Sequence, residues 1–319
     1  MNREKNRNIL TITLNPAMDV FVHLESLQPG ALHRPSQSIK SPGGKGINVA
    51  KALHSFGAPV VASGFLGGDN GRWIENSLND AGICTRFQSI AQETRMNVKI
   101  VERDGRLTEL NSPSPSLKRE DWGKLDSLLE NAAKESEWIA LCGKLPEQAP
   151  DDWYEQAIQS CKAYGAKIAL DTSGKALAYA IRAQPDFIKP NIEELQELTG
   201  ENLKTSQEII NAAEKLARSG ISTVAVSLGA QGMIVAKRQG VWKVTVPKVD
   251  VRSPVGAGDS VVAGFLHGFY ENLPINETIR FAAASGTAAV MKEGTVQPEL
   301  TDINPLLKSI QIEKQEVNQ

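Results

Sequence analysis

Short strand-like runs alternate with longer helical patterns along most of this 319-residue chain. Several of the strand-like runs are continuously apolar, which is expected of strands covered on both faces. This alternation predicts an α/β fold with a doubly wound, mostly parallel sheet flanked by helices. The strands are expected at residues 9–14, 60–65, 138–142, 167–171, 187–189 and 223–228. The helices are expected at residues 47–56, 72–80, 119–134, 152–164, 193–198 and 206–219.

One segment departs from this alternation. Two β-type runs at residues 96–103 and 106–111 are separated by Asp104-Gly105, which is a strong hairpin signal. Together with residues from about 21 to 40, this hairpin is expected to form a small β layer that stands off the main sheet. We interpret the layer as a lid that closes over a substrate and excludes water, with a decorative hairpin as the alternative.

The domain organisation is expected to be simple, because the chain has no internal repeat, low-complexity block or flexible linker. Residues 1–319 are therefore expected to form a single domain, with the lid built from about 21–40 and 96–111. The polar residues 311–319 are expected to be frayed.

Composition argues against several classes of protein. A formal net charge of −2 and the lack of a long basic run speak against a nucleic-acid partner. The polar start has no signal-peptide pattern, and no apolar stretch is long enough to span a membrane. Cys84, Cys142 and Cys161 have no C-x-x-C spacing and are expected to be reduced thiols. A cytoplasmic protein without a membrane partner is expected.

The residues Gly256-Ala257-Gly258-Asp259 open a helical pattern. The apolar residues on one face of this helix are Val261, Val262, Phe265, Leu266 and Phe269. Small residues let the backbone turn sharply, and the amides and dipole of a helix N-terminus favour a phosphate or developing negative charge. Asp259 is the first carboxylate of the helix, and it is either an N-cap or a catalytic group.

A second glycine-rich turn, Gly43-Gly44-Lys45-Gly46, also leads into a helical pattern. It is not a Walker A loop, because the spacing differs and no Ser or Thr follows Lys45. It offers backbone amides, the charge of Lys45 and the side-chain amide of Asn48 one helical turn inside. This set suits a phosphorylated and hydroxylated small molecule, and an ordinary loop with an exposed lysine is the alternative.

Two further polar residues flank expected strands. Asp19 follows the first strand, where a carboxylate can accept hydrogen bonds from sugar hydroxyls or cap a turn. Arg95 lies at the root of the expected hairpin, where its planar fork can reach a substrate phosphate. A solvated arginine at a strand end is the alternative for Arg95.

Two segments in the second half of the chain suit a nucleotide. In Lys189-Pro190-Asn191, a β run leads into a helix, and Glu194 follows three residues after Asn191. This spacing suits either a magnesium ion held through water or a helix cap closed by Glu194. The segment from Ser227 to Gly232 is a cradle for nucleotide phosphates or ribose, or an ordinary turn after a strand.

These segments occur together and in a fixed order. The order is Asn15-Pro16 with Asp19, residues 43–50, residues 94–99, Lys189-Pro190-Asn191 with Glu194, Ser227-Leu228-Gly229, and Gly256-Ala257-Gly258-Asp259-Ser260. In this the chain resembles the ribokinase-like (PfkB-type) family of sugar kinases, from about Ile9 to the last helix. The resemblance implies a ribokinase-like α/β fold, with a doubly wound, mostly parallel sheet flanked by helices and a small β-sheet lid.

The resemblance implies an enzyme that transfers a phosphoryl group from MgATP to a hydroxyl of a sugar phosphate. It is greatest to family members that convert fructose 1-phosphate to fructose 1,6-bisphosphate. Tagatose 6-phosphate and fructose 6-phosphate remain alternative acceptors. A non-catalytic sugar-phosphate sensor is a further alternative, but Asp259 argues against it because a sensor needs no base. A homodimer formed through the β lid is also implied.

The resemblance also assigns roles to single residues. Asp259 matches the catalytic base, and the anion hole that stabilises the transferring group matches Gly256, Ala257 and Gly258. The residues that match the sugar-phosphate site are Asp19, Gly44 and Asn48 at the hydroxyls and Lys45 and Arg95 at the phosphate. The residues that match the ATP site are Lys189, Asn191, Ser227, Gly229, Gly232 and Gly258, with Glu194 as the magnesium residue.

Two positions depart from the family pattern. The family usually has Ser or Asp followed by Thr before the Gly-Ala-Gly-Asp run, and here the sequence is Ser253-Pro254, which removes a hydroxyl near the nucleotide and leaves the base intact. The family usually has Gly-Ser-Leu-Pro after the central strand, and here the sequence is Gly143-Lys144-Leu145-Pro146. Lys144 is therefore either an added contact to the substrate phosphate or an outward-pointing side chain. The sugar preference is left open by this departure.

Overall fold

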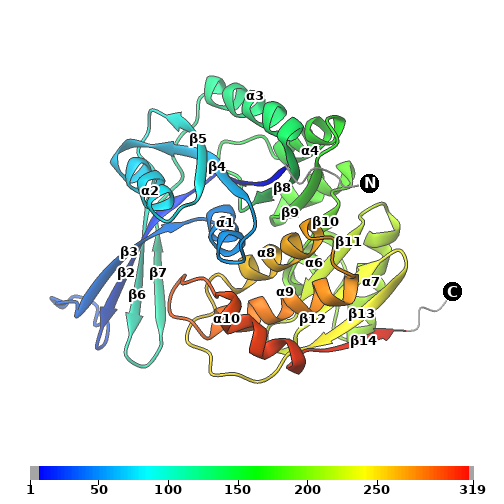
Figure 1. Cartoon of the computed structure of the whole chain (residues 1–319). Coiled ribbons are helices and arrows are strands. Elements are labelled where there is room, and N and C mark those ends of the chain that lie inside the picture. Colours follow the sequence, from blue (N-terminus) through cyan, green and yellow to red (C-terminus); the bar gives the residue numbers. More distant parts are fainter. Residues whose placement is uncertain (1–6, 316–319) are drawn as a thin grey trace.

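Apolar strands and amphipathic helices build a layered α/β structure (Figure 1). The computed structural model describes residues 7–315. Within these residues, a ten-stranded sheet has the order β14-β13-β12-β11-β10-β9-β8-β1-β4-β5. Its strands are β1 (Asn8–Thr13), β4 (Val60–Gly67), β5 (Cys84–Ile90), β8 (Ser136–Cys142), β9 (Lys167–Asp171), β10 (Phe187–Ile188), β11 (Thr223–Ser227), β12 (Met233–Lys237), β13 (Gly240–Thr245) and β14 (Gln311–Gln315).

Helices cover both faces of this sheet. The helices on one face are α1 (Lys45–Ser55), α2 (Gly68–Asp80), α8 (Ala257–Tyr270) and α9 (Ile275–Val290), followed by α10 (Leu300–Ile303) and the 3-10 turn η3 (Asn304–Ser309). The helices on the other face are α3 (Arg119–Glu135), α4 (Trp153–Ala163), α5 (Gly174–Ala180), α6 (Ile192–Thr199) and α7 (Ser206–Arg218). Because successive strand residues point to opposite faces, Ile9 belongs to one apolar core and Leu10 to the other.

The structure confirms the predicted fold class. The six expected strands are β1, β4, β8, β9, β10 and β11, and neighbouring pairs among them run parallel. The six expected helices are also present, although α2 begins at Gly68 rather than at Arg72. Parallel strands of one sheet end at the same edge, so the polar residues after β9, β10 and β11 lie along that edge.

The expectation of a frayed end at residues 311–319 is wrong for residues 311–315. These residues form β14, which pairs antiparallel with β13 and places Ile312 opposite Val244. Ile312 is half-buried against the apolar core, and backbone pairing stabilises a strand whose other side chains are polar. Residues 316–319 lie outside the described residues.

A second sheet of four strands stands off the main sheet, at the lower left of Figure 1. Its order is β3-β2-β6-β7, and its strands are β2 (Ala17–Leu24), β3 (Gln37–Gly43), β6 (Met96–Glu102) and β7 (Leu107–Asn111). The predicted hairpin is confirmed, because β6 and β7 pair antiparallel and Gly105 turns between them with φ +85°. We call these four strands the small sheet.

The small sheet begins earlier than expected, at Ala17 rather than near residue 21. Asp19 therefore lies inside β2 and does not simply follow the first strand of the main sheet. The chain passes from β1 to β2 through Asn15-Pro16, and the β-branched and aromatic residues after Asp19 extend the strand. The small sheet thus carries one of the predicted sugar-binding residues itself.

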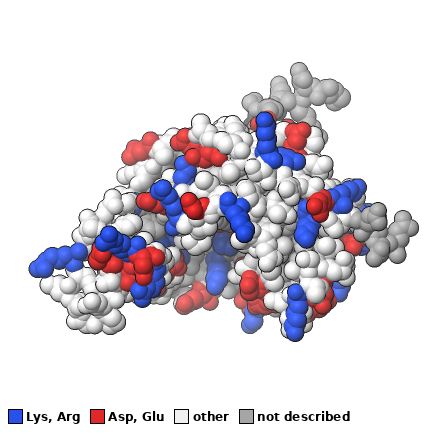
Figure 2. Space-filling view, turned by 90° about the horizontal axis from the view of Figure 1, so that it is seen from below, with Lys and Arg blue, Asp and Glu red and all other residues white. Residues whose placement is uncertain are grey.

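The visible surface of the molecule carries charges of both signs. Seen from below, Lys and Arg are interspersed with Asp and Glu on the visible face and do not gather into one basic surface (Figure 2). Among the described residues, no helix has both the length and the apolar character needed to cross a bilayer. The three cysteines are free, with Cys142 and Cys161 buried and Cys84 exposed.

Candidate active site

Asp259 lies in the first turn of α8 and is buried. Gly256 caps the helix with φ +79°, and no side chain makes a capping hydrogen bond. Asn48 of α1 donates a hydrogen bond from Nδ2 to Asp259 Oδ2 over 2.8 Å. The N-cap alternative for Asp259 is therefore wrong, since Asp259 is the third residue of the helix and is held by a different element.

The surroundings of Asp259 favour its protonated form. Burial raises the pKa of Asp259, and the nearby charge of Asp171 raises it further. Lys45, the hydrogen bond from Asn48, and Lys189 act in the opposite direction but do not outweigh burial. The pKa of Asp259 thus lies above its ordinary value of 3.8, which suits a group that takes up a proton.

Asp171 lies at the carboxyl end of β9, and the sequence motifs gave it no role. It is 1% exposed, and its two carboxylate oxygens contact two different lysines. Lys45 Nζ lies 3.2 Å from Oδ2, and Lys189 Nζ lies 3.4 Å from Oδ1. The position of Asp171 at the end of an expected strand could have marked it as a site residue, because Asp19 was predicted to bind a ligand for that reason. The structure therefore joins Lys45 and Lys189, which the sequence assigned to different substrates, through one buried carboxylate.

These ion pairs favour the charged forms of Asp171 and Lys45. Burial raises the pKa of Asp171, but Lys189 and then Lys45 lower it more, so the pKa lies below 3.8. Burial lowers the pKa of Lys45, but Asp171 first, and then Asp259 and Glu194, raise it above its ordinary value. The result is a fixed pair of ammonium groups beside Asp259.

Lys189 also lies against the turn that begins α8. A Cβ atom added to Gly258 would lie 3.4 Å from Lys189 Nζ. The amides of this first turn have no carbonyl four residues earlier in the helix to bind. The Ala257 amide donates to Pro254 O over 3.5 Å, whereas the Gly258 amide has no partner among the described residues. The Gly258 amide, the helix N-terminus and the buried ammonium group of Lys189 therefore converge, which is the arrangement expected of an anion site.

The turn before α1 brings the backbone close to two polar side chains. Gly44 caps α1 with φ +122°, and a Cβ on Gly43 would lie 2.5 Å from Asp19 Oδ2. A larger residue at position 43 would displace the Asp19 carboxylate. Asn48 is buried, and no donor among the described residues reaches its Oδ1. That oxygen is an acceptor facing no partner, as expected of a residue that binds a ligand hydroxyl.

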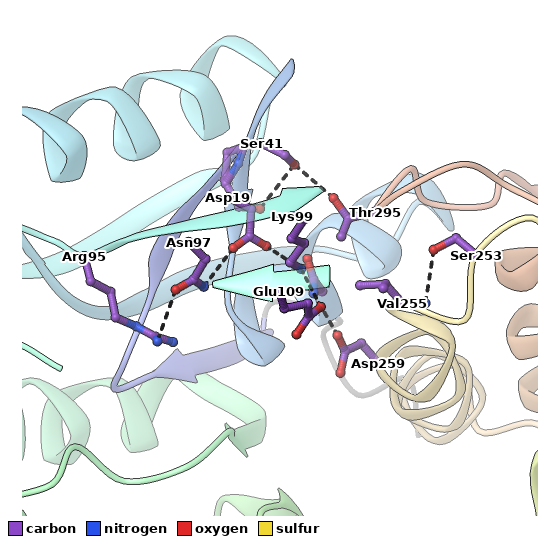
Figure 3. A network of polar contacts seen from close by, with 12 residues as sticks. Asp19, Ser41, Arg95, Asn97, Lys99, Glu109, Ser253, Val255, Asp259 and Thr295 are labelled. Carbon is purple, nitrogen blue, oxygen red and sulfur yellow. Dashed lines mark hydrogen bonds and ion pairs between the residues drawn. The ribbon is translucent and has the colours of Figure 1, made fainter. Parts of the chain in front are cut away.

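A row of polar side chains crosses one face of the small sheet (Figure 3). Asn97 Nδ2 donates to Asp19 Oδ1 over 3.0 Å, and Lys99 Nζ lies 3.0 Å from Asp19 Oδ2. Arg95 Nη1 donates to Asn97 Oδ1 over 3.3 Å. The row is thus continuous from Arg95 to Lys99, and Asn97 and Lys99 were given no role in the sequence.

Arg95 is tied to its own surroundings rather than exposed to solvent. Its guanidinium donates to the backbone carbonyls of Asn15, over 3.2 Å, and Ser112, over 3.1 Å. Burial lowers the pKa of Arg95 below its ordinary value. The alternative of a solvated strand-end arginine is wrong, and Nε remains buried without a partner among the described residues.

The residues predicted to bind ATP follow β10 and β11. Asn191 caps α6, with its Oδ1 accepting from Glu194 N over 2.7 Å and its own N donating to Glu194 Oε2 over 3.0 Å. The capping alternative for this pair is therefore confirmed. Ser227 N donates to Pro190 O over 3.0 Å, which joins the two segments. No group of three or more metal-type side chains occurs in the part of the chain that the structure describes.

The remaining predicted residues have less specific surroundings. Gly232 has φ +95°, and a Cβ there would lie 2.0 Å from Val244 O, so close packing on β13 accounts for this glycine. Gly229 has φ +58° in the 3-10 turn η2 (Gly229–Gln231). Lys144 is exposed and makes none of the hydrogen bonds or ion pairs found among the described residues.

A cavity of about 850 Å³ separates the small sheet from loops at the ends of α8 and α9. Phe21 and Ile39 of the small sheet and Thr295 of a loop are among its lining residues. Neither Asp19 nor Asp259 lines it.

The comparisons with known proteins agree with this arrangement. Residues 12–302 match the pattern of the pfkB family carbohydrate kinases. The chain belongs to this family. As a pfkB family member it is a carbohydrate kinase, which takes ATP as its phosphoryl donor and a sugar as its acceptor.

Several pfkB relatives match over nearly their whole length. The 1-phosphofructokinase of Bacillus subtilis (strain 168) is 37% identical over 287 residues, which cover 89% of this chain and 93% of that protein. The 1-phosphofructokinase of Borreliella burgdorferi is 35% identical, covering 96% and 98%. The structure of phosphofructokinase-2 from Escherichia coli in complex with fructose-6-phosphate superposes with a TM-score of 0.89 at 26% identity, covering 95% and 98%.

Proposed function

We propose that this kinase transfers the γ-phosphoryl group of ATP to the C6 hydroxyl of fructose 1-phosphate, giving fructose 1,6-bisphosphate. The observation that carries the proposal is the similarity to 1-phosphofructokinases at 35–37% identity over most of the chain. The buried Asp259 beside an open helix N-terminus supports transfer rather than sensing, because binding alone needs no base.

In this proposal Asp259 is the general base. Its carboxylate takes the proton of the C6 hydroxyl late in the transfer, when that hydroxyl has become acidic. The amides of Gly256, Ala257 and Gly258 stabilise the charge of the phosphoryl group as it moves. Little covalent chemistry is asked of the protein, so in-line positioning and charge stabilisation supply most of the rate.

The sugar phosphate is proposed to lie between the small sheet and α1. Asp19, the Gly44 backbone and the unpartnered Oδ1 of Asn48 bind its hydroxyls. Arg95 and Lys45 bind its phosphate, with Lys144 as an added contact from an exposed position. The ion pair of Lys45 with Asp171 also brings this lysine close to the phosphoryl group in transfer.

ATP is proposed to lie along the carboxyl ends of β10 and β11. Its contacts are Lys189, Asn191, Ser227, Gly229, Gly232 and Gly258. Mg²⁺ fits this strip, because the helix cap uses Oε2 of Glu194 and no hydrogen bond among the described residues uses Oε1. Glu194 would then hold Mg²⁺ through water, as is usual for an ion that keeps most of its hydration shell. When bound, the ion neutralises charge on the ATP phosphates.

We also propose a cytoplasmic homodimer formed through the small sheet, which acts as a lid. Met96 and Leu110 are exposed on neighbouring strands of this sheet, at 40% and 57%. Apolar groups exposed in this way suit contact with a second copy of the chain. Sedimentation of the Leu110→Lys variant tests the dimer, since a charge there should weaken self-association.

A coupled assay of ADP release tests the substrate. The purified protein with MgATP is given fructose 1-phosphate, tagatose 6-phosphate and fructose 6-phosphate in turn. The proposal expects the highest kcat/KM with fructose 1-phosphate, and a ³¹P spectrum of the product as fructose 1,6-bisphosphate. A higher value with either other sugar would make that sugar the substrate. Calorimetric binding of a sugar phosphate with no ADP release would indicate a sensor.

A further inference from the structure

Lys99 is a buried lysine that has no role in the proposed function, although it ends the segment 94–99 that carries part of the family resemblance. It is 7% exposed on β6, where the register of the small sheet places it opposite Phe21 of β2 and Glu109 of β7. Its Nζ lies 3.0 Å from Asp19 Oδ2, and 5.2 Å from the centre of the Phe21 ring. A lysine is seldom buried without a reason, because burying its charge is costly unless it is paired.

Lys99 keeps hydrogen-bonding capacity after pairing with Asp19. An ammonium group has three N–H donors, and Asp19 takes one of them. Glu109 Oε1 lies 3.9 Å away, which is an ion pair but too long for a hydrogen bond. Among the described residues, at least one N–H of Lys99 is therefore left for a ligand.

Asp19 also keeps capacity. Its Oδ1 accepts from Asn97 and its Oδ2 lies beside Lys99, so each oxygen has one donor. A carboxylate oxygen offers two lone-pair directions, which leaves room for a ligand hydroxyl. Asp19 and Lys99 thus present a free acceptor and a free donor side by side, on the same face of the small sheet (Figure 3).

We propose that Lys99 is a substrate-binding residue that recognises one ring hydroxyl of the sugar phosphate together with Asp19. Asp19 accepts the hydrogen of that hydroxyl, and Lys99 donates to its oxygen. A sugar that lacks this hydroxyl, or carries it in the inverted configuration, would leave Asp19 and Lys99 buried without that partner. The pair therefore discriminates against such a sugar. The inference rests on the proposed function, since it requires a sugar phosphate as the substrate.

The test pairs variants with altered substrates. Wild type, Lys99→Met and Lys99→Gln are assayed with fructose 1-phosphate and with its 3-deoxy and 4-deoxy analogues. Lys40→Met is the control, because Lys40 is an exposed lysine of the same sheet, on β3 opposite Val20 of β2. Calorimetry of fructose 1-phosphate binding without nucleotide gives a second readout that does not depend on turnover.

With fructose 1-phosphate, Lys99→Met should lose about ten- to hundredfold in kcat/KM through KM for the sugar, the usual effect of losing a charge-assisted hydrogen bond. Lys99→Gln should lose less, because its amide still donates. For one of the two deoxy analogues, the kcat/KM of the wild type should already be lower than for fructose 1-phosphate. With that analogue, Lys99→Met should lower kcat/KM by less than about threefold relative to the wild type. The Lys40→Met control should match the wild type throughout.

Two results would overturn the inference. An equal loss with the parent sugar and both analogues would mean that Lys99 only stabilises the small sheet, as would unchanged sugar affinity in a folded Lys99→Gln variant. The proposed function is judged separately, on the wild type alone. If the wild type does not phosphorylate fructose 1-phosphate, the proposed function fails whatever the variants do.

Discussion

Asn48 Nδ2 donates to Asp259 Oδ2 over 2.8 Å, so the first turns of α1 and α8 meet at one buried carboxylate. Both helices begin at a glycine with positive φ, Gly44 in one case and Gly256 in the other. The hydrogen bond fixes the direction of the carboxylate and leaves Asn48 Oδ1 without a partner among the described residues. The proposed acceptor hydroxyl would therefore meet the base and an orienting amide in the same place.

The pH dependence of the rate should reflect Asp259. Burial and Asp171 raise its pKa above 3.8, while Lys45 and Lys189 oppose the rise. Because the base must be ionised, kcat/KM should fall as the pH drops through this raised pKa, at a higher pH than for an ordinary aspartate. A pH profile for fructose 1-phosphate checks this. Activity that stays constant down to pH 3.8 would contradict it.

Asp171→Asn should affect both stability and the pH profile. The folded pKa of Asp171 lies below 3.8, so its stabilising effect is present above that pH and is lost as the pH falls below it. At neutral pH the variant should lose about 3–5 kcal/mol of unfolding free energy, because Lys189 is left buried without its partner. Denaturant unfolding measures this loss.

The same variant should move the acidic limb of the rate profile to lower pH, because the charge that raises the pKa of Asp259 is gone. Asp151→Asn is the matched control, since Asp151 is 58% exposed and pairs with Lys175 at 4.0 Å. That control should change stability by less than about 1 kcal/mol. If the Asp171→Asn variant has wild-type stability and an unchanged acidic limb, Asp171 does not stabilise the two lysines or raise the pKa of Asp259.

The main sheet could largely be predicted from the sequence, because strands covered on both faces need continuous apolar runs and leave a local signal. β14 gave no such signal. Its side chains are mostly polar, and its stability depends on pairing with β13, which is distant in sequence. The start of the small sheet was placed too late for a similar reason, since Asp19 interrupts the apolar pattern of β2.

The candidate site could be predicted only where a local pattern marked it. The glycine-led helix starts gave Asp259, Asn48 and Lys45. Asp171 and Lys99 were given no role, although Asp171 ends an expected strand and Lys99 lies in the segment 94–99, because neither position by itself distinguishes a site residue from a solvated charge. Which lysine meets which carboxylate depends on strand register and helix packing, and these are set by contacts far apart in the sequence.

Arg95→Gln should mainly raise KM for the sugar phosphate. The loss of a charge-assisted contact predicts a fall of about ten- to hundredfold in kcat/KM, with KM for ATP nearly unchanged. Lys45→Gln should act in the same direction. Arg86→Gln is a control, because Arg86 is 46% exposed and pairs with Glu135. If KM rises equally for the sugar phosphate and for ATP in a variant that unfolds at lower denaturant concentration, the cause is a folding defect instead.

The small sheet should respond to the sugar phosphate. Arg95 is joined through Asn97 to Asp19, so binding at the phosphate and at the hydroxyls should order the same strands. Hydrogen exchange should slow across residues 96–111 when fructose 1-phosphate binds, even without nucleotide, while β8 and β9 stay unchanged. Unaltered exchange in the hairpin at saturating sugar phosphate would mean that it is not a substrate-responsive lid.

The turnover of Asp259→Asn with MgATP and fructose 1-phosphate tests the central claim most directly. The substitution keeps the shape of the side chain and removes a buried charge that the fold disfavours above pH 3.8, so the variant should be at least as stable at neutral pH. Its kcat should fall by about two to four orders of magnitude, the usual contribution of a general base. A folded variant that retains more than about a tenth of wild-type turnover would show that Asp259 is not the base.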